Sequence, residues 1–441
     1  MAKELPVVDG VRLIHAENHD VKMVFVEVAI EAGSVLDPKG KEGLASLSAR
    51  MFLRGTDQRT YQEIMDEVND LGASLDSSGH KEFIALAGDF MPRYLDRYAA
   101  IMADVLTNPV FPDKEFEHER SLVLEDLLNV RNDDADLARY FFARFLYQGH
   151  PLGRPNVGYS TSVASLKASD CRGFYKKNVR KGNLVVVLAG AIDEKAAKDF
   201  VKKITAGIPA GPRVRTDLPP APKWKGIRVM VVDKPERTQT QVLLGHPSLN
   251  WRSPDLFPLL VGNTAFGGTF TSRLMQEIRE KRGWSYGASS FITAGREFGT
   301  LAIRFFPANK DTVPAIRLTL DLLNDLVDKG LTDEETGYAR NHIANQFPFR
   351  LETARKRAAE QLADEIYGRP DGYIRDYVAT VRKQTTKGIN AALARWFQPD
   401  DLAVVVVGTA KDLVGDLEKI PGVTSVVVHP FDKDQLANER K

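Results

Sequence analysis

The chain has 441 residues, more than one ordinary hydrophobic core accommodates, so two or more domains are expected. Hydrophobic residues make up 43% and charged residues 27%, the balance of a globular protein, and a formal net charge of +1 favours neither a nucleic acid nor an anionic membrane surface as partner. The single cysteine, Cys171, excludes an internal disulfide and a cysteine-rich metal site.

No stretch approaches the length of a membrane span, and the N-terminal residues MAKELPVVDG contain no apolar signal core. The sequence therefore predicts a cytoplasmic protein by default, or a periplasmic one if a leader has been removed from the chain as given.

The first half of the chain alternates between strand and helix patterns. Thr60 and Glu63 are spaced as a capping box, and Gly72 marks the end of the helix that they begin. A strongly apolar strand, LVVVLAGA, closes the series. In chain order, the predicted elements are strands at 11–16 and 22–32, helices from 42 and over 61–71, a strand pattern over 74–89, helices over 92–105 and 113–130, and a strand over 184–191.

Residues 206–225 hold five prolines and two glycines and are predicted to form a linker. After them the order of patterns starts again. Gly226–Val229 resembles Gly10–Leu13, and Leu402–Gly408 resembles Leu184–Gly190, each about half the chain away. A period this long indicates a duplicated domain rather than a solenoid. The predicted fold class is therefore α+β with two similar domains, 1–205 and 226–441, each a mixed, largely antiparallel sheet packed with helices.

The stretch Gly267–Ser290 is the most informative part of the second half. The paired glycines, Gly267 and Gly268, can adopt positive φ, so they allow a tight turn or a close approach to a ligand. A helix pattern follows and ends at Gly283, with Arg279 near its end and Tyr286 just beyond the turn. A guanidinium and a phenol held in this way can both donate hydrogen bonds to one carbonyl or oxyanion. Alternatively, Arg279 is a charged residue on the surface of its helix, and Tyr286 is a residue of an amphipathic strand.

The segment GLASLSARMFLRGT, Gly43–Thr56, resembles the zinc-binding segment of peptidase family M16, the pitrilysin, insulinase and mitochondrial processing peptidase relatives. In that family a His-x-x-Glu-His motif lies on a helix, where histidines at i and i+4 hold zinc and the glutamate activates a water molecule. Here Ser46 and Arg50 stand at the histidine positions and Ala49 at the glutamate position. The family's distant metal-binding carboxylate falls at Asp126, within Glu119–Asp126. The resemblance thus implies a degenerate metal site, without zinc in this chain.

Three further segments extend this resemblance along most of the chain. GHPLGRP, Gly149–Pro155, matches a family segment, and Gly72–Phe83 matches the edge strand that pairs with an extended peptide. Ser272–Tyr286 is similar to the family's arginine/tyrosine element. The resemblance implies catalytic roles for Arg279 and Tyr286. It implies substrate-binding roles for Ser74, Leu75, Asp76, Ser77, Gly267 and Gly268.

The favoured interpretation is a subunit of a heterodimeric M16B metallopeptidase that is inactive alone. A partner subunit with an intact His-x-x-Glu-His motif would supply zinc, and this chain would supply Arg279, Tyr286 and half of a clamshell chamber for extended peptides. It would carry no cofactor of its own. Two alternatives are a structural subunit, like the core proteins of the respiratory bc1 complex, and a module that binds peptides without cleaving them.

Arg50 and Asp126 are also predicted to interact directly. A guanidinium has a longer stem than an imidazole, so Arg50 can fill the volume of the former metal site and pair with Asp126. The alternative is that Arg50 points to solvent while Asp126 caps a helix or pairs locally.

Overall fold

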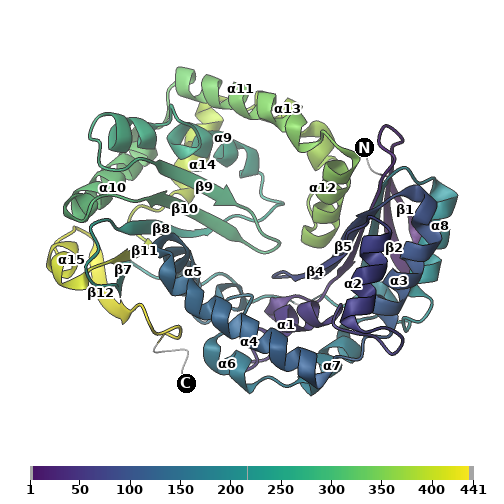
Figure 1. Cartoon of the computed structure of the whole chain (residues 1–441). Helices are drawn as coiled ribbons and strands as arrows, with labels where there is room; N and C mark the ends of the chain where they lie inside the picture. The colour runs from purple at the N-terminus through teal and green to yellow at the C-terminus, as the bar shows by residue number, and fades with distance from the viewer. Residues whose placement is uncertain (1–2, 216, 437–441) are drawn as a thin grey trace. The chain divides into compact units, whose positions relative to one another are not determined.

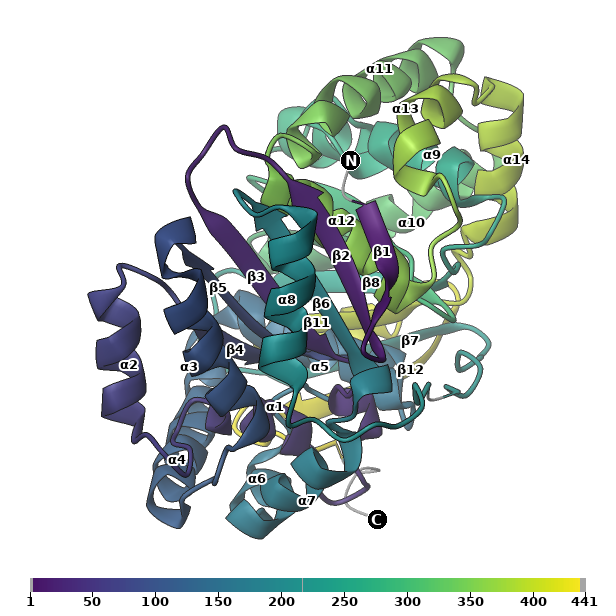
Figure 2. The same cartoon turned by 90° about the vertical axis from the view of Figure 1, so that its right-hand side faces the viewer.

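The computed structural model describes residues 3–215 and 217–436, and this part of the chain forms two compact units. Each unit is built on one six-stranded mixed sheet with helices on its faces (Figures 1 and 2). The first unit takes the described residues of Met1–Leu128, Arg154–Asp217 and Arg350–Ile366, and the second those of Asn129–Gly153, Leu218–Phe349 and Tyr367–Lys441. The predicted α+β class and the duplication are confirmed.

The sheet of the first unit has the order β1-β2-β6-β3-β5-β4. Its central strand β6 is almost wholly buried, as its run of valines and leucines predicts, and it runs parallel to β2 while all other pairs are antiparallel. Strand β4 lies at the edge and pairs only with β5 within the described sheet. The strands are β1 Lys3–Val8, β2 Val11–Glu17, β3 Val24–Ile30, β4 Asp76–Gly79, β5 Ile84–Phe90 and β6 Leu184–Gly190.

Helices cover both faces of this sheet. Figure 2 shows α3 and α8 packed together across one face, while α12 lies against the other. The remaining helices of the unit gather beyond the strands, where α1 packs on α7 and on β4. The helices are α1 Leu44–Met51, α2 Tyr61–Asp70, α3 Leu95–Thr107, α4 Asp113–Asn129, α6 Ser160–Ser165, α7 Ala168–Asn178, α8 Glu194–Thr205 and α12 Ala354–Tyr367.

The sheet of the second unit repeats the plan, with the order β12-β7-β11-β8-β10-β9. Helix α5 covers one face of the sheet, and α9 and α14 pack together on the other (Figure 1). Its strands are β7 Ile227–Asp233, β8 Gln241–Ser248, β9 Ala288–Thr293, β10 Gly299–Phe305, β11 Ala403–Gly408 and β12 Val423–Pro430. Its helices include α5 Asp134–Leu146, α9 Leu256–Gly267, α10 Thr312–Lys329, α11 Asp333–Arg350, α13 Tyr373–Arg382, α14 Thr386–Trp396 and α15 Ala410–Leu417.

The two units are not continuous in sequence, unlike the predicted domains 1–205 and 226–441. Helix α5 comes from the first half of the chain but packs in the second unit, where Phe141 and Phe145 share a buried core with Val405 of β11. Helix α12 comes from the second half and packs in the first unit. An apolar helix face does not record which of two similar sheets it covers, so the sequence pattern could not reveal this exchange.

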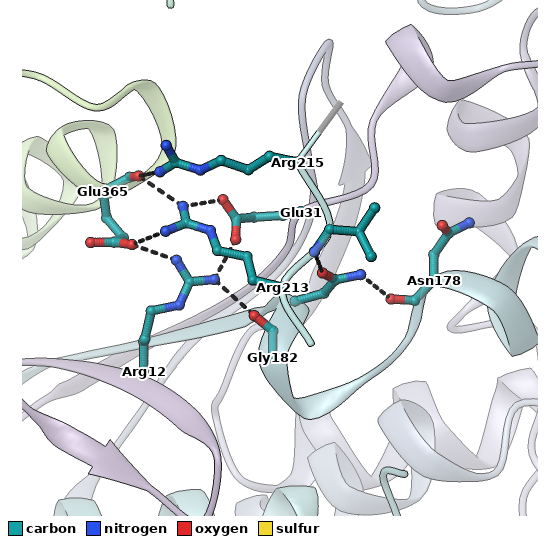
Figure 3. Close-up of polar contacts among 9 residues, drawn as sticks. Arg12, Glu31, Asn178, Gly182, Arg213, Arg215 and Glu365 are labelled. Carbon is teal, nitrogen blue, oxygen red and sulfur yellow. Dashed lines mark hydrogen bonds and ion pairs between the residues drawn. The ribbon is translucent and has the colours of Figure 1, made fainter. Parts of the chain in front are cut away.

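A network of charged side chains ties α12 and the start of the linker to the first sheet (Figure 3). Arg12 of β2 and Arg213 of the linker each pair with both Glu31 and Glu365, and Arg213 donates to Glu365 over 2.8 Å. Glu365 is a residue of α12 with a side chain only 20% exposed. Burial raises the pKa of Glu365, but the two guanidiniums outweigh it and hold the pKa below its ordinary value.

The predicted linker 206–225 is therefore hydrogen-bonded to the first unit over part of its length. The backbone N–H groups of Lys181 and Gly182 donate to the carbonyls of Pro209 and Gly211, and the N–H of Val214 donates to the side chain of Asn183. The described linker residues up to 215 belong to the first unit, and those from 218 belong to the second. Among the described residues, no helix is long and apolar enough to cross a membrane.

Candidate functional site

Helix α1 carries the three positions predicted to be a degenerate metal site. Gly43, with φ of 97°, precedes it, and the carboxylate of Asp37 accepts hydrogen bonds from the N–H groups of Gly43 at 2.8 Å and Ala45 at 2.9 Å. Burial raises the pKa of Asp37 to about 7, although these two hydrogen bonds favour its charged form. Ser46, Ala49 and Arg50 follow at the i, i+3 and i+4 spacing of one helix face.

Arg50 reaches across to α4, as predicted. Its guanidinium donates a hydrogen bond of 2.8 Å to Asp126 and lies 3.5 Å from Glu119, which also pairs with Arg54. Glu119 is only 2% exposed, whereas Asp126 is 56% exposed. The ion pair between Arg50 and Asp126 is thus confirmed, and the site is a cluster of two cations and two anions.

Sequence reasoning missed Glu119 and Arg54 as members of this cluster. Glu119 precedes Asp126 by seven residues, so the two carboxylates share one face of α4. Arg54 likewise follows Arg50 by four residues. Those two spacings were the signal in the sequence that could have identified the full cluster.

Strand β4 runs beside α1. The hydroxyl of Ser77 donates to the carbonyl of Ala49 over 2.7 Å, and a Cβ at Gly79 would lie 2.8 Å from the Cα of Ser46. The strand and the helix therefore approach so closely that only glycine fits at that point. The outer edge of β4 is not hydrogen-bonded to another described strand, which is the arrangement that strand addition by a peptide needs.

The predicted substrate-binding residues of this segment differ in their exposure and in their hydrogen bonds. Asp76 and Ser77 lie in β4, and Asp76 is exposed. Leu75 is only 2% exposed, so its side chain packs in the core. The carbonyl of Ser74 accepts from the hydroxyl of Tyr98 over 2.8 Å and its N–H donates to Asp89. Ser74 and Leu75 therefore hold the start of the edge strand in place, and β4 itself offers the free backbone edge.

The arginine/tyrosine element of the second unit contains a π-helix, η6, over Met275–Glu280. The N–H of Lys281 donates to the carbonyl of Gln276, five residues earlier, over 3.0 Å. Gly283 then takes φ of 65° and lets the chain leave the helix, where the N–H of Trp284 donates to Ile278. Single-turn π-helices of this kind occur frequently at functional sites.

The structure brings Arg279 and Tyr286 together at an exposed position. The guanidinium carbon of Arg279 lies 4.8 Å from the ring centre of Tyr286 and 5.6 Å from that of Phe270. Tyr286 is 78% exposed and Phe270 is 74% exposed. Two aromatic rings near one guanidinium limit its motion, and its Nε lies 3.5 Å from a carboxylate oxygen of Glu280, which leaves its two terminal NH₂ groups as donors. Phe270, an apolar residue in the glycine-rich turn, was not singled out from the sequence.

The expectation that Gly267 and Gly268 use positive φ is wrong. Neither glycine has positive φ; Gly267 ends α9 and Gly268 caps it, with φ of −91°. A Cβ at Gly267 would lie 2.3 Å from Oγ of Ser290, and one at Gly268 would lie 2.7 Å from Cα of Thr264. These residues are glycines because the end of α9 packs closely against β9 and against its own last turn. Their role in substrate binding stays a prediction.

Two family models match successive parts of this chain. Residues 12–159 match the model described as insulinase (peptidase family M16), and residues 165–343 match the model described as peptidase M16 inactive domain. Together they span most of both sheets. The chain belongs to peptidase family M16.

Related proteins support the same assignment. The chain is 24% identical to the non-peptidase homolog YmxG of Helicobacter pylori, over 91% of this chain and 92% of that protein. It is 21% identical to a protein of Bacillus subtilis named uncharacterized zinc protease YmxG, over 94% of this chain and 100% of that protein. Names among these relatives thus include both a protease and a non-peptidase.

Solved structures share the fold. A peptidase M16 inactive domain from Pseudomonas fluorescens superposes with a TM-score of 0.85 at 22% identity, covering 92% of this chain and 98% of that one. A chain of complex III2 from Candida albicans superposes with a TM-score of 0.77 at 15% identity, covering 93% and 97%. At these identities the likeness shows the fold alone.

The residues of α1 do not fit the zinc that family M16 implies. Serine is a poor zinc ligand, alanine offers no donor atom, and the guanidinium of Arg50 repels a cation. Among the residues that the structure describes, no group of three or more His, Cys, Asp or Glu side chains is placed to hold a metal ion. The position where relatives would hold zinc is filled here by an ion pair.

Proposed function

We propose that this chain is the non-zinc-binding subunit of a heterodimeric M16B metallopeptidase and is inactive alone. The observation that carries the proposal is a contrast between two elements. Arg50, at a position that the resemblance assigns to a zinc-binding histidine, pairs with Asp126, whereas Arg279 lies beside the exposed ring of Tyr286. A purely structural subunit would not need Arg279 and Tyr286 placed side by side.

In this proposal the chain binds and orients a peptide rather than activating water. The free edge of β4 pairs with the backbone of an extended peptide, and the exposed Asp76 lies beside it. Arg279 and Tyr286 donate hydrogen bonds to the scissile carbonyl, which strengthen as its oxygen becomes an oxyanion. The partner subunit, which carries the intact His-x-x-Glu-His motif, supplies zinc and the catalytic glutamate. The two chains together form the substrate chamber.

Two non-catalytic functions are the second candidates. The non-peptidase name of the Helicobacter pylori relative favours a module that binds peptides without cleaving them. The likeness to a chain of complex III2 is compatible with a structural subunit. The structural function leaves the pairing of Arg279 with the exposed Tyr286 unexplained, so it ranks below the first.

The deciding experiment purifies the native protein with the protein bound to it and assays peptide cleavage by each chain alone and by the mixture. We expect cleavage in the mixture and none by this chain alone, with zinc in the partner only. A chelator should abolish the activity of the mixture. Stoichiometric zinc together with chelator-sensitive cleavage by this chain alone would contradict the proposal. A stable complex that cleaves no peptide from a diverse mixture would favour the structural or peptide-binding function.

A further inference from the structure

The second unit contains a cavity of about 500 Å³ that the proposed function does not use. Three segments form its wall: the end of the linker, the end of β8, and the chain that follows α14. The lining residues are Ala221, Pro222, Lys223, Trp224, Lys225, His246, Pro247, Ser248, Trp396, Gln398 and Asp401. A volume of this size suits a small organic ligand.

This cavity lies at the opposite end of the sheet from the arginine/tyrosine element. Ser248, in the cavity wall, pairs with Gly299 at the start of β10, whereas Phe305 at the other end of β10 pairs with Ala288. Ala288 follows Tyr286 by two residues. Six strand residues at about 3.3 Å each separate the two ends by about 20 Å. The cavity is therefore a separate site.

Aromatic and apolar groups dominate the wall. Trp224 and Trp396 contribute indole rings, and Pro222 and Pro247 contribute rigid apolar surfaces. The indole N–H of Trp396 already donates to Asp255 over 2.8 Å, so this ring is fixed in place. Rigid aromatic walls favour a ligand with a flat apolar ring.

Two polar groups of the residues in the wall lack partners within the part of the chain that the structure describes, a hydroxyl that can donate or accept and an indole N–H that can only donate. The hydroxyl of Ser248, a residue only 4% exposed, and the indole N–H of Trp224 are buried without a hydrogen-bond partner in the described chain. His246 is satisfied, because its Nε2 accepts from the N–H of Gln398 over 3.3 Å and its Nδ1 therefore donates to Pro247 over 2.8 Å. Both unpaired atoms are shielded from the open cavity, so the rings and the charges of the wall decide which ligand fits.

The charges around the cavity favour an anion. Lys223 and Lys225 are exposed among the lining residues, and Asp401, the one carboxylate in the described lining, accepts from the N–H of Gly226 over 2.7 Å. The guanidinium carbon of Arg228 lies 4.1 Å from the indole ring centre of Trp224 and 5.0 Å from the ring centre of Phe145. Burial lowers the pKa of Arg228 below its ordinary value.

We propose that this cavity binds a small organic anion in which a carboxylate is joined to an aromatic ring. The ring would lie among the indoles and prolines, and the carboxylate would face Lys223 and Lys225. A free aromatic acid and the C-terminal aromatic residue of a peptide both present this chemistry. The inference does not depend on the peptidase function.

Calorimetric titration of the full chain with indole-3-acetate and with indole-3-acetamide tests the carboxylate. We expect the acid to bind at least about tenfold more tightly than the amide, the usual effect of hydrogen bonds to a charged group. Acetyl-glycyl-phenylalanine and its C-terminal amide then identify the source. Tighter binding of the peptide acid than of indole-3-acetate indicates a peptide C-terminus, and the reverse indicates a free acid. Equal binding of acid and amide, or no binding at millimolar concentration, would overturn the proposal.

Variants locate the binding in this cavity. Trp224→Leu removes an aromatic ring of the cavity wall, and its matched control is Trp251→Leu, which removes an indole of the same unit outside the cavity lining. The double change Lys223→Ala and Lys225→Ala is compared with Lys310→Ala and Lys329→Ala, two exposed lysines outside the cavity. We expect about tenfold weaker binding in each cavity variant than in the wild type. The control variants should bind as tightly as the wild type. Unchanged binding in both cavity variants, or tighter binding of tetramethylammonium than of the acid, would contradict the assignment.

Discussion

The guanidinium of Arg50 donates a 2.8 Å hydrogen bond to the carboxylate of Asp126 and thereby joins helix α1 to helix α4. The resemblance to the zinc segment of family M16 implies that, in members with the complete motif, a metal ion holds ligands from the corresponding two helices. Here the same helices are joined by charge, and the buried carboxylate of Glu119 lies within 3.5 Å of the same guanidinium. Arg50, at a position that the resemblance assigns to a histidine, thus joins the two helices by an electrostatic contact.

We predict that removing Arg50 and removing Asp126 lower the free energy of unfolding by different amounts. Asp126→Ala should lower the free energy of unfolding by less than about 1 kcal/mol, because this carboxylate is 56% exposed and screened by solvent. Arg50→Ala should cost more, because it also removes a cation near Glu119, which is only 2% exposed. Urea unfolding of both single variants and the double variant measures these costs and the coupling between them. A larger loss for Asp126→Ala than for Arg50→Ala, or strictly additive losses, would contradict this account.

We predict that Arg279→Ala and Tyr286→Phe each lower the turnover of the two-chain enzyme. Loss of one oxyanion donor typically reduces kcat on the order of 100-fold. Steady-state kinetics on a peptide substrate gives the effect, and co-elution of the two chains shows whether assembly is intact. Arg282→Ala is the matched control, because Arg282 lies in the same element but pairs with Glu277. Wild-type kinetics in both variants would assign Arg279 and Tyr286 a structural role.

The sequence predicted what depends on local pattern and on residue type. The capping box of Thr60 and Glu63 begins α2 as expected, and the predicted helix 113–130 is α4, Asp113–Asn129. The contact between Arg50 and Asp126 also followed from the length of the arginine side chain. These features need only the spacing of residues along one helix, or the likeness of a segment to a known one.

What the sequence could not predict depends on packing between distant segments. Gly267 contacts Ser290, and only the folded chain shows that this approach, rather than a positive φ, requires glycine. The exchange of α5 and α12 between units has the same cause, since either helix face suits either sheet. Phe270 near Arg279 is likewise a product of the turn geometry.

We predict that stability falls at mildly acidic pH because of His246. Burial lowers the pKa of this imidazole below its ordinary value of 6.5, so the folded chain binds the proton less readily than the unfolded chain does. Its contribution to stability is fully present above about pH 6.5 and is lost as the pH falls through the lower, folded-state pKa. Thermal unfolding between pH 7.5 and 5 should therefore show a smaller loss for His246→Gln than for the wild type.

The control for this prediction is His19→Gln, since His19 is exposed. That variant should follow the wild-type pH dependence. If His246→Gln also follows it, another group governs the acid sensitivity, and the neutral state of His246 is not what stabilises the fold.

The last prediction concerns the network that holds α12 on the first unit. Glu365→Gln removes one of the two carboxylates that Arg12 and Arg213 share in the described chain, and leaves Glu31 as the other. Because the carboxylate is only 20% exposed, we expect a local loss of about 2–4 kcal/mol. Hydrogen exchange should therefore become faster in α12 and at Val214 of the linker, whose N–H donates to the side chain of Asn183. Glu352→Gln is the matched control, because that residue is 62% exposed and pairs only with Lys356. Exchange in α12 that is as slow in Glu365→Gln as in the control would mean that apolar packing, and not this network, holds the exchanged helix.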